Sequence, residues 1–273
     1  MIVQSAPQGE PHFIVTMAEH CLLAGRFAKL FGNAYFEPVV PLNEMLYLIN
    51  HHDRGWFELD AFPCVDPQTG LPWHLSNTPN ALKVTTMMKS VNFNQAHHLY
   101  CGLLAVMHMW GIYHGRYGLS NNALIDTIPK EYKDEFNQQC ILLEQRKTLL
   151  ETQLKQDSIT QAWLKRYLWQ NYKQLQFFDT LSLYFSCTCA SQRQPHIFAQ
   201  VPMSATATQT VTIQPLDNHH YLMSPFPFKH KTVSLRFKGQ YLQSAKRDKP
   251  ELFQALKDAP LQEQIVNIVE LKT

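Results

Sequence analysis

The spacing of apolar residues changes once along the chain, close to Cys189, and this change constrains the fold more than any other feature. Before Cys189, apolar side chains recur every three or four residues over 17–31, 42–52 and 159–187, which is typical of helices with one buried face. After it, apolar and polar residues alternate, as in Val233-Ser234-Leu235-Arg236-Phe237, which is typical of strands. The chain therefore needs helices first and strands afterwards.

We expect a mainly α protein in two parts, a helical body over residues 1–190 and a small antiparallel β-rich extension over 191–273 that packs on it. Residues 60–80 hold five prolines or glycines, which indicates a loop. The remaining elements are expected as helices over 80–113, 130–157 and 249–258, and as a last strand over Gln264–Leu271.

Composition excludes several classes of protein. The 273 residues carry a net charge of only +2, without a run of basic residues, so we expect no nucleic-acid partner. No apolar stretch approaches the roughly 20 residues that span a bilayer, so we expect no membrane partner. The first residues lack the charged and apolar regions of a secretory signal, which favours a cytoplasmic location.

The six cysteines are scattered and none forms a CxxC pair. Cys187 and Cys189 are the only close pair, and a zinc knot built on them is one alternative. Buried free thiols in a reducing cytoplasm are the interpretation that we favour.

The tripeptide His51-His52-Asp53 joins imidazole and carboxylate, two kinds of metal ligand, at neighbouring positions. Adjacent side chains on a helix diverge by about 100°. Both can still reach one ion beyond a helix end, where the backbone opens. Gly55 follows two residues later, and glycine commonly ends a helix.

Three further polar residues lie among apolar helical neighbours: His20, His108 and Asp179. A lone histidine in such a place usually bonds a backbone carbonyl, and a lone aspartate usually caps a helix or pairs with an arginine. A buried carboxylate is costly unless it is paired or metal-bound. Together with His52 and Asp53 these residues predict a metal site assembled from four helices.

The order His20, His52-Asp53, Asp179 resembles the HD-domain superfamily of metal-dependent phosphohydrolases. A closer similarity is carried by the segments His52–Trp56, Asp66–Pro72, Met107–Gly118 and Phe178–Tyr184. It is to an uncharacterised bacterial family, domain of unknown function 3891. These resemblances imply an HD-domain-like helical bundle with a metal site. A departure is the proline-rich loop 56–79, where HD phosphohydrolases often place helical histidines.

The resemblance to the HD superfamily implies a metal-dependent hydrolase that acts on a phosphate ester or related small molecule through a metal-activated water. His20, His52, Asp53 and Asp179 would hold one divalent ion, for which imidazole and carboxylate suit Fe, Mn, Zn, Ni or Co. His108 would bind a second ion or act as general acid. Arg116 would bind the phosphate through its guanidinium fork, with a surface position as the alternative. Arg54 has the same two interpretations.

Two other functions use the same ligands. An HD-type di-iron oxygenase needs six protein ligands, of which the sequence supplies five. A non-catalytic metal or small-molecule binding protein needs only the site. A small-molecule substrate is the expected partner, and a homo-oligomer is left open. The roles of the other histidines in this region are also open, namely His51, His74, His97, His98 and His114.

Overall fold

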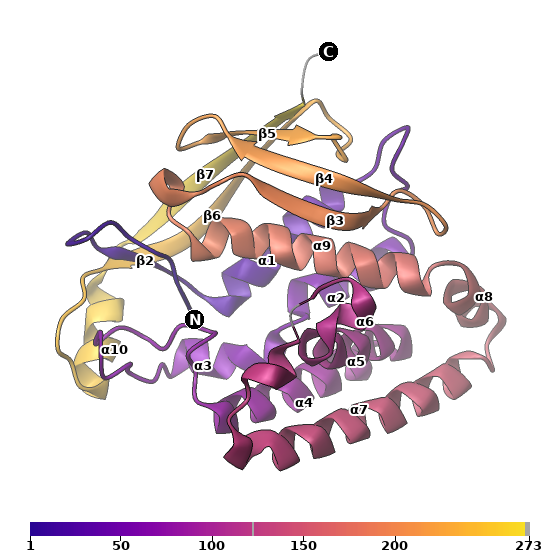
Figure 1. Ribbon diagram of the computed structural model, residues 1–273, viewed down its shortest axis with the longest axis horizontal. Helices are drawn as coiled ribbons and strands as arrows, with labels where there is room; N and C mark the ends of the chain where they lie inside the picture. Colours follow the sequence, from indigo (N-terminus) through magenta and orange to yellow (C-terminus); the bar gives the residue numbers. More distant parts are fainter. Residues whose placement is uncertain (122, 271–273) are drawn as a thin grey trace.

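The computed structural model describes residues 1–121 and 123–270, and Figure 1 shows a sheet on one side of two central helices and further helices on the other. The central helices are α1 and α9. The helices are α1 Met17–Leu30, α2 Leu42–His51, α3 Phe57–Ala61, α4 Asn80–His97, α5 Leu99–Tyr113, α6 Gly115–Gly118, α7 Lys133–Leu154, α8 Ser158–Arg166, α9 Leu168–Cys187 and α10 Lys249–Asp258. The strands are β1 Ile2–Val3, β2 His12–Val15, β3 His196–Pro202, β4 Thr208–Pro215, β5 His220–Ser224, β6 Thr232–Leu242 and β7 Leu261–Glu270.

The helices predicted over 17–31, 42–52 and 249–258 are confirmed as α1, α2 and α10. The predicted helix over 80–113 is instead two helices, α4 and α5, which meet at His98. His98 has an extended backbone (φ −158°, ψ 140°), and its Nδ1 accepts a hydrogen bond from the Tyr100 amide at 3.1 Å. A side chain that caps the next helix in this way ends the previous one.

The strands overturn the predicted fold class. Within the described residues they form one seven-stranded sheet in the order β1-β2-β6-β7-β5-β4-β3. The protein is therefore not a mainly α, HD-domain-like bundle with a small extension. The sheet is also not purely antiparallel, because β5 and β7 run parallel. Since parallel neighbours need a crossover connection, β6 and α10 lie between them in the chain.

The N-terminal strands were missed because they are too short to show a period. Strand β2 has four residues, and three of them are buried in succession. It pairs with the far end of the long strand β6, where Phe13 lies opposite Tyr241. The sheet thus takes strands from both sides of residue 190, while the division into parts 1–190 and 191–273 stays a prediction.

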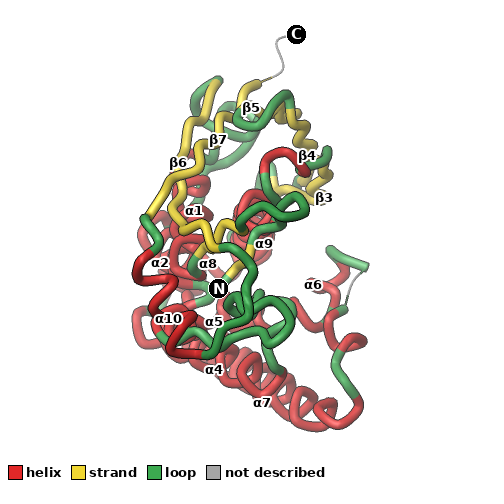
Figure 2. Tube along the Cα trace, turned by 90° about the vertical axis from the view of Figure 1, so that its left-hand side faces the viewer, coloured by secondary structure: helices red, strands yellow, loops and turns green. Residues whose placement is uncertain are grey.

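The sheet curves around α1 and α9, as the turned view in Figure 2 shows. Aromatic side chains fill the space between the sheet and these two helices. Phe27 of α1 packs on Phe185 of α9 and on Phe228, with ring centroids 5.9 and 6.0 Å away, respectively. On their other side the two helices contact α2 and α5. Among the described residues, no helix has the length and apolar character needed to cross a membrane.

Candidate metal centre

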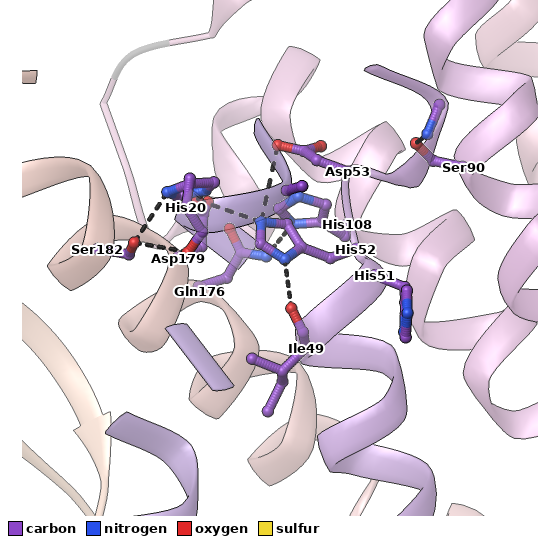
Figure 3. Close-up of polar contacts among 12 residues, drawn as sticks. His20, Ile49, His51, His52, Asp53, Ser90, His108, Gln176, Asp179 and Ser182 are labelled. Atoms are coloured by element: carbon purple, nitrogen blue, oxygen red, sulfur yellow. Dashed lines mark hydrogen bonds and ion pairs between the residues drawn. The ribbon is translucent and has the colours of Figure 1, made fainter. Parts of the chain in front are cut away.

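Side chains from four segments converge between the central helices and α5. His20 comes from α1, His52 and Asp53 from the end of α2, His108 from α5 and Asp179 from α9 (Figure 3). The Oδ1 atom of Asp179 lies 3.3 Å from His20 Nε2 and 3.5 Å from His52 Nε2. Asp53 Oδ2 lies 3.7 Å from the same His52 nitrogen. The structure thus brings together all five residues that the sequence singled out as metal ligands.

Hydrogen bonds orient His20 and His52 so that each turns Nε2 toward the carboxylates. The Ser182 hydroxyl donates its one proton to the His20 carbonyl oxygen at 2.8 Å, so its oxygen accepts from His20 Nδ1 at 2.9 Å. His52 Nδ1 donates to the Ile49 carbonyl oxygen at 2.8 Å. A neutral imidazole carries one ring proton, so Nε2 of each ring is left with a lone pair.

These lone pairs face the Oδ1 atom of Asp179. His20 and His52 are fully buried, and neither Nε2 atom has a hydrogen-bond partner among the described residues. Unpaired acceptors that face a carboxylate in a buried site are unfavourable unless a cation or a proton lies between them. The arrangement is that of a metal site in which partners at Nδ1 fix the ring orientation.

The pKa shifts of Asp179 and His52 also indicate that the centre favours a positive charge. Burial raises the pKa of the Asp179 carboxyl, but His20 and His52 outweigh burial and hold it well below its usual range. Burial lowers the pKa of His52, but Cys21, Asp53 and Asp179 outweigh burial and raise it well above the ordinary value. A divalent ion between these groups would supply the positive charge that the carboxylates otherwise favour as a proton on His52.

His108 differs from the other two histidines. Its Nδ1 lies 2.8 Å from Gln176 Nε2, which donates to it, so the ring proton sits on Nε2 and faces the centre. A half-turn of the amide would exchange nitrogen and oxygen and make Nε2 a lone-pair donor. Burial lowers the pKa of His108 to about 3, so the ring is neutral. In the orientation present, His108 can donate a hydrogen bond to a bound molecule.

Asp53 reaches the centre because the chain turns sharply after α2. His52 is still helical (φ −57°, ψ −34°), whereas Asp53 is not (φ −105°, ψ 28°). The next turn is held against α4, where the Ser90 hydroxyl accepts from the Gly55 amide at 2.9 Å. A Cβ at Gly55 would overlap the Thr86 carbonyl oxygen, so only glycine allows this close approach.

Helix α9 contributes one polar face to the centre. Gln176, Asp179 and Ser182 are three residues apart in turn and therefore lie along one side of the helix. Gln176 contacts His108, and Ser182 contacts His20. Neither Gln176 nor Ser182 was predicted from the sequence as part of the site. The sequence signal that could have identified them is a set of polar residues at helical spacing within an otherwise aromatic helix.

Arg116 lies at the edge of the centre and Arg54 does not. Arg116 Nη2 is 3.8 Å from Asp179 Oδ2, and its side chain is 24% exposed. The Arg54 guanidinium lies over the rings of Phe57 and Phe93, at 4.6 and 4.8 Å from their centroids. The structure therefore separates two arginines that the sequence could not distinguish.

The neighbouring histidines have other contacts. His51 points away from the centre (Figure 3) and its Nδ1 donates to the Tyr47 carbonyl oxygen at 2.8 Å. His97 stacks on Tyr47, and His114 stacks on Trp110. His74 Nδ1 accepts from the Val3 amide, and His98 caps α5.

The cysteines are free, and the groups of described residues that could hold a metal ion contain none of them. Cys187 and Cys189 are therefore not brought together with further ligands as a zinc knot requires. Cys21 is buried next to His52, and burial raises the pKa of its thiol.

Comparison with known proteins gives a single result. The model of a family described as "Protein of unknown function (DUF3891)" matches residues 1–244. No curated protein and no solved structure matches the chain. The relationship to the HD superfamily thus stays a prediction, whereas the closer resemblance is confirmed over most of the sequence. The chain belongs to the DUF3891 family of proteins of unknown function.

Proposed function

We propose that this protein binds one divalent transition-metal ion through His20, His52, Asp53 and Asp179 and is a metal-dependent hydrolase. One observation carries the proposal: Nε2 of His20 and Nε2 of His52 converge on one oxygen of Asp179, with both Nδ1 atoms committed elsewhere. Two imidazoles and two carboxylates favour Fe, Mn, Zn, Ni or Co over harder cations.

The ligand set favours one ion. The donor atoms of His20, His52 and Asp179 lie within 4.8 Å of one another, and so do those of His52, Asp53 and His108. Both groups need His52, and its Nδ1 is occupied by the Ile49 carbonyl. Only Nε2 is left, and one lone pair binds one ion. A second ion would need His108 with its Gln176 partner turned.

Hydrolysis is the chemistry that these residues best support. A bound ion of this class lowers the pKa of a coordinated water. The side chains of Asp53 and Arg116 are 14% and 24% exposed, whereas the histidines are fully buried, so water and substrate would enter past these two residues. His108, with its proton on Nε2, would donate to an oxygen of the substrate.

The substrate class follows from charge and from ligand order. Arg116 adds a permanent positive charge beside the carboxylates, which suits a phosphate ester or a related small anion. The order His20, His52-Asp53, Asp179 along the chain supports a relationship to the HD phosphohydrolases, although the seven-stranded sheet is not part of the predicted bundle. An HD-type di-iron oxygenase is less well supported, because the described centre offers five ligands rather than six.

The test combines metal content with turnover in matched variants. The wild type, purified without chelator, should contain close to one ion per chain and hydrolyse an aryl phosphate. His52→Ala should lose both, whereas His51→Ala, one residue away and facing outward, should keep both. A protein that takes up no Mn, Fe or Zn would refute the site. A stoichiometric ion without turnover on a broad substrate panel would refute the hydrolase and leave a metal-binding protein.

A further inference from the structure

Four successive residues, 115 to 118, have a left-handed backbone. Their φ angles are 61° at Gly115, 53° at Arg116, 56° at Tyr117 and 84° at Gly118. Left-handed turns are unfavourable for residues with a Cβ, and glycine is the usual occupant. Arg116 and Tyr117 therefore hold a strained conformation that their own sequence does not favour. Strain of this kind persists where the surroundings impose it, and it concentrates at functional sites.

The surroundings of the turn impose its shape. A Cβ at Gly115 would lie 2.7 Å from the Ser120 carbonyl oxygen, so the turn needs glycine at its start. The Ser120 amide donates to the Gly115 carbonyl at 3.0 Å and closes the turn. The Tyr117 ring is fixed against Trp110 and Tyr172, with centroid distances of 4.6 and 5.2 Å.

The conformation directs Arg116 toward the metal centre and leaves its guanidinium with unused donors. Its one charged contact among the described residues is Asp179, at 3.8 Å, which is longer than a hydrogen bond. A guanidinium carries five N–H donors, so most of them are available to a ligand. The site also holds a second unused group: Tyr172 is fully buried and its hydroxyl has no hydrogen-bond partner among the described residues.

Tyr172 precedes Gln176 and Asp179 by four and seven residues and so lies on the same face of α9. Its hydroxyl meets the α5 backbone at Gly111, one turn beyond His108. Its ring packs against Tyr117, the residue that follows Arg116, with ring centroids 5.2 Å apart. A phenol O–H and a guanidinium fork on the same side of the centre together suit an anion with several oxygen atoms.

We propose that the left-handed turn 115–118 positions Arg116 as the anion-binding residue of the metal centre, with the Tyr172 hydroxyl as a second donor. The ligand class is a small oxyanion, either a phosphoryl group or a carboxylate. This inference rests on the proposed function, because the anion would lie over the metal ion. It adds to that function a second donor, the Tyr172 hydroxyl, and a reason for two strained residues in sequence.

Inorganic phosphate and acetate, titrated calorimetrically into the metal-loaded protein, test the inference. Arg116→Gln should weaken phosphate binding at least about tenfold, as expected for loss of a charged hydrogen bond, with metal content unchanged. Arg54→Gln is the matched control, since Arg54 stacks on Phe93 outside the centre, and it should bind phosphate as the wild type does. Tighter wild-type binding of phosphate would assign the phosphoryl class, and tighter binding of acetate the carboxylate class.

A second variant separates strain from function. Arg116→Gly removes the side chain but suits the left-handed backbone, so it should unfold at a higher urea concentration than Arg116→Gln and bind phosphate as poorly. Unchanged phosphate affinity in both variants, with the metal in place, would overturn the inference and leave the metal site intact. A wild-type protein that binds no metal would overturn the inference together with the proposed function.

Discussion

His51 and His52 are neighbours in the sequence with opposite environments. The His52 ring is buried and points at Asp179, whereas the His51 ring packs on Tyr47 at the edge of the molecule. The sequence predicted His52 and Asp53 as the ligand pair from their helical partners. It could not predict the tautomers, because these depend on a serine 162 residues away from His20 and on a backbone carbonyl. The type and order of the ligand residues could be predicted from the sequence, whereas the orientation of their rings could not.

Ser182 should therefore matter to metal binding although it is not a ligand. Ser182→Ala removes the acceptor of the His20 Nδ1 proton and should weaken metal affinity about 10- to 100-fold. Competition with a chromogenic chelator measures the effect. Ser186 is the matched control: it is buried on the same helix, and its hydroxyl has no partner among the described residues. Equal metal affinities for Ser182→Ala and Ser186→Ala would contradict the account.

At the scale of elements, the centre depends on close contact between helices. Helix α2 ends where the chain passes against α4, and α9 presents Gln176, Asp179 and Ser182 along one face. The positions of α1 and α2 were predictable from apolar spacing. The break at His98 was not, because it depends on a capping hydrogen bond rather than on the period of apolar residues.

Gly55 tests the contact between α2 and α4. In Gly55→Ala the new methyl group would collide with the Thr86 carbonyl oxygen, so the segment that carries Asp53 must move. We expect a loss of about 1–3 kcal/mol in the free energy of unfolding, as for other overpacked sites. Metal affinity should fall as well. Urea denaturation and chelator competition measure the two effects, and wild-type values for both would refute the proposed role of this contact.

At the scale of the whole molecule, the N-terminal segment joins the helices to the sheet. Strand β2 pairs with β6, and β1 extends the same edge. The loop before α4 reaches this edge through His74, whose Nδ1 accepts from the Val3 amide at 3.0 Å. Sequence patterns alone predict a sheet only in the C-terminal tail, because β1 and β2 are too short to show alternation. Long-range pairing, rather than local pattern, made that prediction wrong.

His74 predicts a dependence of stability on pH. Burial lowers its pKa from 6.5 to about 4. Below pH 6.5 the unfolded chain therefore takes up a proton that the folded chain does not, and stability falls as pH drops toward 4. This contribution is complete above pH 6.5 and amounts to about 3 kcal/mol at most.

Urea titrations of the wild type and of His74→Gln between pH 7.5 and pH 4 isolate this effect. The unfolding free energy of the wild type should fall relative to that of His74→Gln as the pH falls, because glutamine keeps an acceptor for the Val3 amide but takes up no proton. A difference that stays constant over this range would show that His74 does not cause the pH dependence.

The most direct measurement of the central claim is anomalous diffraction from a crystal loaded with Mn, Fe or Zn. We expect one peak about 2.0–2.3 Å from Nε2 of both His20 and His52, with Asp53 and Asp179 oxygens completing the ligands. An anomalous map without a peak between these four side chains, or with the ion elsewhere on the chain, would contradict the metal centre.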